Sequence, residues 1–409
     1  MKKFFASILS CMLLGSMATI SAQGYQDGVD NFNADRLDVA KTILLNTLGS
    51  PSTDKAVSNY YLGQIAFLEG DMAAAQKYFN EGAAANPSYA YNLIGQGQMT
   101  LKNGDKKGAE TSFKKAMELD KKNTAVIAAV ARAYYNVDPA AYAKEIDKWI
   151  AKAMKDSKNR EAAVYVLNGD MVAKEDPGKA AAEYEMAISM DGDKNVVNRE
   201  AYVKYANTYF HVNPKFAIDK LVELNEKEPE SALAQRELAE KYYDNEQFGS
   251  ACIQYGKYMA NPNHFQNDEQ RYAGLLYSAG EYQKSLDIAN GVLAKDPDNE
   301  YMYRVIMLDK TALKDYAGAE EAGRKLFADP KAKKIANDYI LYADALGDQE
   351  KYPEAIEIYK QAIAANPDQA DLLTKLSAMY DRAGQGELAI QTMKQYLDAG
   401  NGSVQDIFN

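Results

Sequence analysis

The residues that most often perform chemistry are few in this chain and far apart. Its only histidines, His211 and His264, lie 53 positions from each other, so no His-x-x-x-His pair is available to hold zinc. Neither adjoins a serine, cysteine or carboxylate in the arrangement that activates a nucleophile. We therefore expect both histidines to have structural or solvent-facing roles.

Two short stretches begin like ligand-binding loops but do not continue as such. "GQGQMT" starts at Gly95 like a dinucleotide-binding turn, yet Thr100 stands where the third glycine is required. "DGDKN" starts at Asp191 like a calcium loop, but Val196 replaces the turn glycine and Tyr202 the bidentate glutamate. Acidic pairs on the expected helices are typical of a solvated face. The sequence thus predicts no enzymatic activity, no cofactor and no metal.

The two cysteines predict no intramolecular disulfide. Cys11 lies in an N-terminal segment that we expect to be removed, which leaves Cys252 alone. Cys252 follows Ala251 on an expected helix face. We interpret it as a small buried apolar residue, with a reactive thiol as the alternative.

The N-terminus has the three-part form of a secretory signal peptide. Lys2 and Lys3 precede an apolar run from Phe4 to about Leu14, and small residues follow up to Ala22. We predict removal of residues 1–22 and export to the periplasm or the outer envelope of a bacterium. Two alternatives stay open: an uncleaved anchor, although serine, glycine and threonine dilute the apolar run, and a lipoprotein, because "ILSC" resembles a lipobox.

The charge balance disfavours nucleic acid as a partner. The chain carries 47 Lys and Arg against 58 Asp and Glu, a formal net charge of −11, and loss of residues 1–22 would take this to −13. A net acidic surface opposes the nonspecific phosphate contacts on which nucleic-acid binding depends. The 47% hydrophobic and 26% charged residues are typical of a folded chain.

A repeating pattern is the strongest signal in the sequence. Tyr282 and Pro297 recur as Tyr352 and Pro367, an offset of 70, or twice 35. Apolar stripes of period 3.6 run through the chain and are interrupted by Gly, Asn, Asp or Pro. We therefore expect an all-helical chain of antiparallel helix pairs.

The repeated unit resembles the tetratricopeptide repeat, a helix-turn-helix of 34 residues. The second unit carries that family's pattern of small and large residues at Leu62, Gly63, Ala66, Gly70, Asp71, Ala75, Phe79 and Pro87. The resemblance implies an all-α, right-handed α-α superhelical solenoid of about 10 or 11 repeats that holds a protein or extended peptide in its concave groove. It covers residues 23–400, with no linker between independent domains, and leaves 401–409 as a tail. The expected repeats lie near residues 25–50, 55–88, 89–122, 124–159, 161–193, 198–230, 232–264, 266–298, 300–331, 336–368 and 370–400.

The resemblance also implies which side chains face the groove. In the family, positions 5, 9 and 12 of each first helix line the concave surface. The candidate ligand-binding residues at these positions are Tyr60, Gln64, Phe67, Gln98, Leu101, Arg132, Tyr135, Tyr165, Asn207, Phe210, Arg236, Tyr243 and Tyr277. A polar row beside an aromatic row suits an extended peptide, because amides can bond its backbone while rings take its side chains. The same residues are also consistent with packing between helices, and both interpretations stay open.

From these features we expect a non-catalytic scaffold or assembly adaptor of the bacterial envelope. Capture of a glycan or small molecule on the aromatic row, and a role as accessory subunit of an envelope enzyme complex, are the alternatives. The family's clamp for acidic C-terminal tails is not supported, because Val203 stands where the clamp needs a lysine beside Asn207. The identity of the partner and the oligomeric state do not follow from the sequence.

Overall fold

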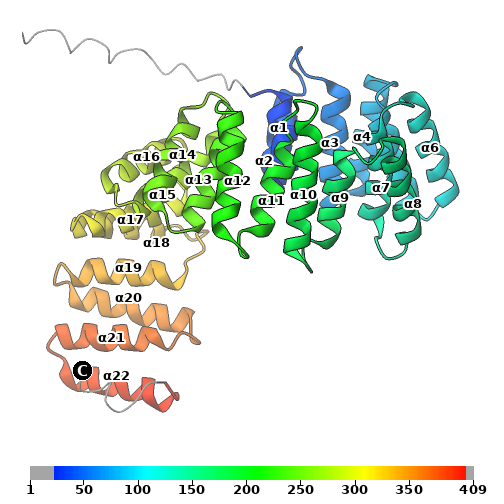
Figure 1. Cartoon of the computed structure of the whole chain (residues 1–409). Helices are drawn as coiled ribbons and strands as arrows, with labels where there is room; N and C mark the ends of the chain where they lie inside the picture. Colours follow the sequence, from blue (N-terminus) through cyan, green and yellow to red (C-terminus); the bar gives the residue numbers. More distant parts are fainter. Residues whose placement is uncertain (1–22, 402–409) are drawn as a thin grey trace, which may run out of the picture. The chain divides into compact units, whose positions relative to one another are not determined.

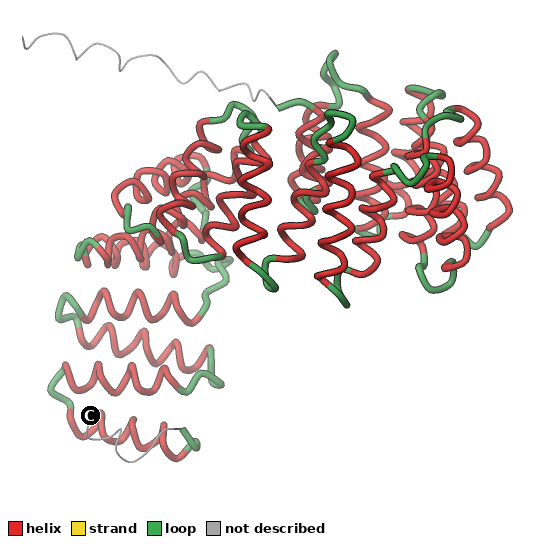
Figure 2. The backbone as a smooth tube through the Cα atoms, viewed as in Figure 1, coloured by secondary structure: helices red, strands yellow, loops and turns green. Residues whose placement is uncertain are grey.

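The computed structural model describes residues 23–401, and within this range the chain consists of helices and their connections (Figure 1 and Figure 2). It contains 22 α-helices and one 3-10 helix in the described range, without a strand there. The expected all-α repeat solenoid is confirmed. The predicted signal peptide at 1–22 and the tail beyond residue 401 lie outside the described residues.

The helices between residues 23 and 401 divide into two compact units. The first comprises residues 23–246 and 257–265, and the second 247–256 and 266–401. The division falls within the expected repeat at 232–264, at helix α14 (Phe248–Ala260), which has residues in both units. No Gly- or Pro-rich linker marks it in the sequence.

The first unit consists of consecutive antiparallel helix pairs that pack in chain order. Each pair lies inside one of the expected repeats. The helices are α1 (Tyr25–Asn33), α2 (Leu37–Thr47), α3 (Lys55–Leu68), α4 (Met72–Ala85), α5 (Ala90–Lys102), α6 (Lys106–Leu119), α7 (Thr124–Val137), α8 (Ala143–Asp156), α9 (Ala162–Val172), α10 (Pro177–Gly192), α11 (Arg199–Tyr209), α12 (Pro214–Lys227) and α13 (Ala232–Asp244).

The second unit continues the same plan. After the 3-10 helix η1 (Gln266–Asp268) its helices again pair in order. They are α15 (Glu269–Ser278), α16 (Tyr282–Lys295), α17 (Glu300–Ala312), α18 (Tyr316–Ala328), α19 (Ala336–Gly347), α20 (Tyr352–Ala365), α21 (Asp371–Arg382) and α22 (Gly386–Asp398).

Side-chain caps set where many of these helices begin. The carboxylate of Asp54 accepts the amide of Ala56 at 2.9 Å at the start of α3. Asp71 and Asp105 accept amides in the same way at the starts of α4 and α6. Each cap satisfies backbone donors that the first helical turn leaves unpaired, and is worth about 1 kcal/mol.

Glycine allows the tight turn and the close packing within a pair. Gly70 has φ 83° between α3 and α4, a left-handed conformation that costs glycine little. Gly63 lies against the ring of Phe79, where a Cβ would come within 2.4 Å of the ring carbon Cε1. Phe79 is itself fully buried and fills the space between neighbouring pairs. These are the roles that the resemblance implies for a small residue in the first helix and a large one in the second.

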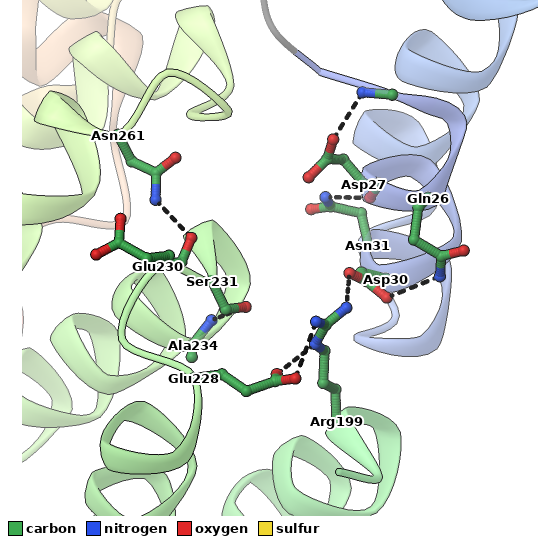
Figure 3. Close-up of polar contacts among 11 residues, drawn as sticks. Gln26, Asp27, Asp30, Asn31, Arg199, Glu228, Glu230, Ser231, Ala234 and Asn261 are labelled. Carbon is green, nitrogen blue, oxygen red and sulfur yellow. Dashed lines mark hydrogen bonds and ion pairs between the residues drawn. The ribbon is translucent and has the colours of Figure 1, made fainter. Parts of the chain in front are cut away.

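The first unit also closes on itself, because α1 packs against α11 and α13 as well as against α2 and α3. Figure 3 shows the polar contacts at this closure. Arg199 on α11 donates to Asp30 on α1 at 2.7 Å and to Glu228, after α12, at 3.0 Å. Gln23 donates to the carbonyl of Asn263 at 3.0 Å. Because of this closure, the first helices of the early and late pairs border the same interior space.

Candidate functional site

A cavity of about 370 Å³ occupies the interior of the first unit. We call it the lumen pocket. Helices α1, α3, α5, α7, α9 and α11 all contribute to its wall, so it depends on the closure of the unit. Its lining residues are Phe32, Asn33, Asp35, Tyr60, Tyr61, Gln64, Leu68, Tyr91, Ala125, Ala128, Ala129, Arg132, Asn136, Ala163, Val166, Glu200 and Lys204.

The helices present these side chains at a spacing of four residues. Tyr60, Gln64 and Leu68 follow one another on α3, and Arg132 and Asn136 do so on α7. Residues four apart lie on one face of a helix, one turn above the other. The pocket wall is therefore built from continuous helical stripes.

One part of the wall is aromatic. The ring of Tyr60 lies 5.2 Å from that of Tyr61 and 5.4 Å from that of Tyr91, both in edge-to-face arrangements. Burial raises the pKa of Tyr91 to about 12 and that of Tyr60 above its ordinary range. These tyrosines are therefore neutral over the physiological range and offer rings and hydroxyl groups to a ligand.

The other part of the wall is charged. Asp170, just behind it, forms ion pairs with Arg132 and with Lys204, the latter at 3.1 Å, and accepts the hydroxyl of Tyr184 at 2.8 Å. Burial acts to raise the pKa of Asp170, but its two cationic partners outweigh burial and hold the pKa below its ordinary value. Asp170 is thus ionised and fixes both cations in place.

The negative charge of Glu200 is less fully compensated by neighbouring cations than that of Asp170. Its side chain is 30% exposed, and its ion-pair partner, Nζ of Lys204, lies 3.8 Å away, beyond hydrogen-bond distance. Burial raises the pKa of Glu200, and the attraction of Lys204 and Arg132 only partly opposes this. The carboxylate therefore faces the pocket with unused acceptor capacity.

Three of the residues predicted to bind a ligand line the lumen pocket: Tyr60, Gln64 and Arg132. A fourth, Gln98, is fully buried next to them and exchanges hydrogen bonds of 3.3 Å with Gln64. Positions 5 and 9 of the first helices thus face the interior in the second and fourth pairs.

The buried residues at position 12 of the first helices do not face the interior of the unit. Phe67, Leu101 and Phe210 are at most 8% exposed and belong to the packing between helices. The reason is geometric: position 13 continues the stripe of positions 5 and 9 at a spacing of four, and Leu68 and Asn136 occupy it. Phe67, Leu101 and Phe210 thus pack between helices and do not line the lumen pocket.

The remaining predicted residues lie outside the lumen pocket. The hydroxyl of Tyr135 donates to the carbonyl of Asp170 at 3.3 Å, and that of Tyr165 to the carbonyl of Asn159 at 3.1 Å. Asn207 is exposed, Arg236 pairs with Glu237 and Glu240, and Tyr243 is half-buried. Tyr277 belongs to the second unit, where its ring lies 5.7 Å from that of Tyr282.

The sequence did not identify several residues of the pocket, among them Asp35, Tyr91, Glu200 and Lys204. The sequence pattern could have indicated Glu200 and Lys204. They are charged residues four positions apart on a helix whose other residues are largely apolar or aromatic. Asp35 lies in the turn after α1, and only the closure of the unit brings it to the pocket.

His264 and Cys252 have side-chain types that can perform chemistry, but their surroundings are those of structural residues. Nδ1 of His264 lies 2.7 Å from the carbonyl oxygen of Asn261. Cys252 is half-buried, and burial raises the pKa of its thiol. Between residues 23 and 401 no group of three or more His, Cys, Asp or Glu is arranged to hold a metal ion. In the same range no helix has the length and apolar character needed to cross a membrane.

A second cavity, of about 430 Å³, lies at the closure of the first unit beside α1. Its wall includes Asp27, Asp30, Arg199 and Glu228. Burial raises the pKa of Asp30, and its ion pair with Arg199 opposes the rise. Because these side chains already bond one another across the closure, we interpret this cavity as part of the contact between α1 and the later helices (Figure 3).

Comparison with known proteins identifies the repeat. Residues 342–404 match the family model described as tetratricopeptide repeat, so this part of the chain is a tetratricopeptide repeat segment. The resemblance drawn from the repeated residues is thereby confirmed. No curated protein sequence matches the chain at a significant level.

Among solved structures, the chain is similar to several proteins at low sequence identity. Yeast Tom70 is 12% identical, with 94% of this chain and 92% of that chain covered and a TM-score of 0.38. A chain of the APC/C hetero-tetramer Cut9–Hcn1 is 11% identical, with 93% of this chain and 94% of that chain covered and a TM-score of 0.38. MamA is 17% identical, with 42% and 94% covered and a TM-score of 0.35. Similarity at this level does not indicate a shared partner.

Proposed function

We propose that this chain is a non-catalytic scaffold that binds a protein or peptide, and that the lumen pocket is where it holds its partner. The observation that carries the proposal is the convergence of Tyr60, Gln64 and Arg132, from two separate helix pairs, on one cavity. Side chains that a packed core does not need, including charged ones, line that cavity. Tetratricopeptide repeats in the chain are consistent with a role in protein interaction.

The size of the lumen pocket limits what it can hold. A volume of about 370 Å³ is at the lower end of the range for ligand sites. Because α1 closes the unit, we propose that a short segment of a partner enters the pocket. This differs from the long extended peptide that the sequence suggested.

We further propose that the protein acts in the bacterial envelope as an exported adaptor. The basis is the signal-like N-terminus at residues 1–22 and the acidic composition. Both are features of the sequence.

Capture of a glycan or small molecule is a second candidate function. Two observations favour it: the small volume of the pocket, about 370 Å³, and the cluster of Tyr60, Tyr61 and Tyr91, whose rings could stack on a sugar. Preferential binding of an envelope polysaccharide over every envelope protein would support this candidate.

Crosslinking in the native envelope tests the proposal. Tyr60→Ala removes a ring from the pocket, and we expect the yield of the crosslinked partner to fall about tenfold or more, as for loss of an aromatic anchor. Phe216→Ala is the matched control, because that ring is 52% exposed and is not part of the pocket wall. Circular dichroism and the fluorescence of Trp149, the single tryptophan, verify that both variants fold.

Equal yields from wild type, Tyr60→Ala and Phe216→Ala would contradict binding in the lumen pocket. Co-isolation of an envelope enzyme whose turnover depends on this chain would instead indicate an accessory subunit. Turnover by the isolated chain would contradict the non-catalytic assignment.

A further inference from the structure

We infer that the lumen pocket selects a positively charged group: the ammonium or guanidinium of a lysine or arginine side chain on the captured protein. This inference rests on the proposed function, and names the chemistry by which the pocket recognises its partner.

The first argument is the charge balance of the pocket. Two acids, Asp35 and Glu200, and two cations, Arg132 and Lys204, line the pocket, and a third acid, Asp170, forms ion pairs with both cations directly behind the wall. The cluster therefore carries one negative charge in excess when all five groups are ionised. A ligand with a single positive charge would neutralise it.

The second argument is which groups remain available. Asp170 pairs with both Arg132 and Lys204, so the two cations are already compensated. The ion-pair partner of Glu200, Nζ of Lys204, lies 3.8 Å away, beyond hydrogen-bond distance, and Asp35 is exposed in the turn after α1. These two carboxylates are the strong acceptors in the pocket that a ligand could still satisfy.

The third argument is the aromatic wall. Phe32 and Tyr61 contribute rings 5.0 Å apart, and Tyr60 adds a third ring 5.2 Å from Tyr61. All three line the pocket together with Asp35 and Glu200. A cation is attracted to ring faces, and this attraction grows when water is excluded, so the rings and carboxylates favour the same ligand group.

An acidic ligand fits the pocket poorly. Its carboxylate would meet Asp35 and Glu200, while Arg132 and Lys204 would have to give up Asp170 to bind it. Asp170 would then be a buried charge without a partner, which is costly. The pocket thus has the opposite preference to a clamp for acidic C-terminal tails.

A peptide-library experiment tests this inference with the full chain. The probe is a randomised hexapeptide library on beads with blocked termini, so that only side chains carry charge. We expect the wild type to enrich lysine and arginine, and the double variant Asp35→Asn, Glu200→Gln to lose about tenfold of that enrichment. A second library with free amino termini separates recognition of a side chain from recognition of a chain terminus.

Two further proteins serve as controls. Asp219→Asn removes an exposed carboxylate that pairs with Lys215 outside the pocket, and should bind as the wild type does. Tyr60→Ala should bind both libraries about tenfold more weakly, because it removes an aromatic ring of the pocket wall. Trp149 fluorescence and circular dichroism verify the fold of each variant.

The outcomes separate this inference from the proposed function. Tyr60-dependent enrichment of neutral or acidic peptides, unchanged in Asp35→Asn, Glu200→Gln, would overturn the cation preference and leave the pocket as the binding site. Enrichment seen only with free amino termini would overturn the assignment to a side chain. Enrichment of no peptide, or enrichment independent of Tyr60, would count against both the cation preference and peptide binding in the lumen pocket.

Discussion

At the scale of single residues, Asp309 is a buried acid at a position where five other helix pairs have a buried apolar side chain. The position lies five residues before the left-handed turn residue of the pair. It is Ile65, Met99, Leu275, Ala345 and Met379 in those pairs, and Asp309 on α17. The side chain of Asp309 is fully buried, and neither carboxylate oxygen has a hydrogen-bond partner among the described residues.

This environment makes the stability of the second unit depend on pH. Burial raises the pKa of Asp309 from 3.8 to about 7, and Ser285 only partly opposes the rise. The folded state therefore keeps a proton that the unfolded chain loses at a lower pH. The second unit is therefore most stable below a pH of about 4. Its free energy of unfolding falls as the pH rises toward 7 and stays reduced above pH 7.

We predict that Asp309→Asn removes most of this pH dependence. The amide has the shape of the neutral acid and does not ionise. Relative to its own stability at acid pH, the wild type should lose on the order of 4 kcal/mol by neutral pH, while the variant should lose little. Hydrogen exchange of peptides from α15 to α17, measured between pH 4 and pH 8 and corrected for intrinsic rates, reports the difference.

Asp287→Asn is the matched control for this prediction, because Asp287 is exposed on the neighbouring helix α16. It should keep the pH dependence of the wild type. If the stability of wild type and of Asp309→Asn changed with pH in parallel, Asp309 would not control the pH dependence.

At the scale of helices, each pair is held by one large side chain against small ones. Phe113 on α6 is fully buried, with its ring 5.2 Å from that of Tyr134 and with Gly97 of α5 close against it. Ala109 and Ala116 on α6 are fully buried on either side. The equivalent set in the twentieth helix is Tyr359 with Ala355 and Ala362, all fully buried.

We predict that Phe113→Ala lowers the free energy of unfolding of the first unit by about 3–5 kcal/mol, through lost burial and the cavity left behind. Phe216→Ala, which truncates an exposed ring, should change it by less than about 0.5 kcal/mol. Urea unfolding followed by the fluorescence of Trp149 on α8 measures both. Similar losses in the two variants would contradict the role given to Phe113.

The helix pairs were predictable from the sequence because their determinants are local. Turn residues such as Gly70, caps such as Asp71 and packing residues such as Phe79 all lie within one repeat. The candidate site was only partly predictable. Tyr60, Gln64 and Arg132 follow from the position within a repeat, but the burial of Phe67 depends on a rotation of about one residue around the helix, which a single sequence does not define.

At the scale of the whole molecule, the described residues form two compact units, and the candidate site belongs to the first. Its pocket exists because α1 returns to α11 and α13, contacts between residues more than 160 positions apart in sequence, as in the pair of Asp30 and Arg199. No local pattern indicates such a closure. This is why Asp35, Glu200 and Lys204 emerge as one cluster only in the folded chain.

The charged residues of the pocket come from three different repeats. Asp35 belongs to the repeat at 25–50, Arg132 to the repeat at 124–159, and Glu200 and Lys204 to the repeat at 198–230. The repeated residues supply the scaffold, while these side chains distinguish one ligand from another. Specificity is therefore located in the positions that do not repeat.

The most direct test of binding in the lumen pocket is site-specific photo-crosslinking in the envelope. A photoreactive amino acid replaces Asn136, which lines the pocket, or Met186, which is 41% exposed on α10 and is not part of the pocket wall. We predict that one protein partner crosslinks from position 136 and not from position 186, and that Tyr60→Ala abolishes this crosslink. A partner that crosslinks from position 186 alone, or from position 136 regardless of Tyr60→Ala, would contradict the account.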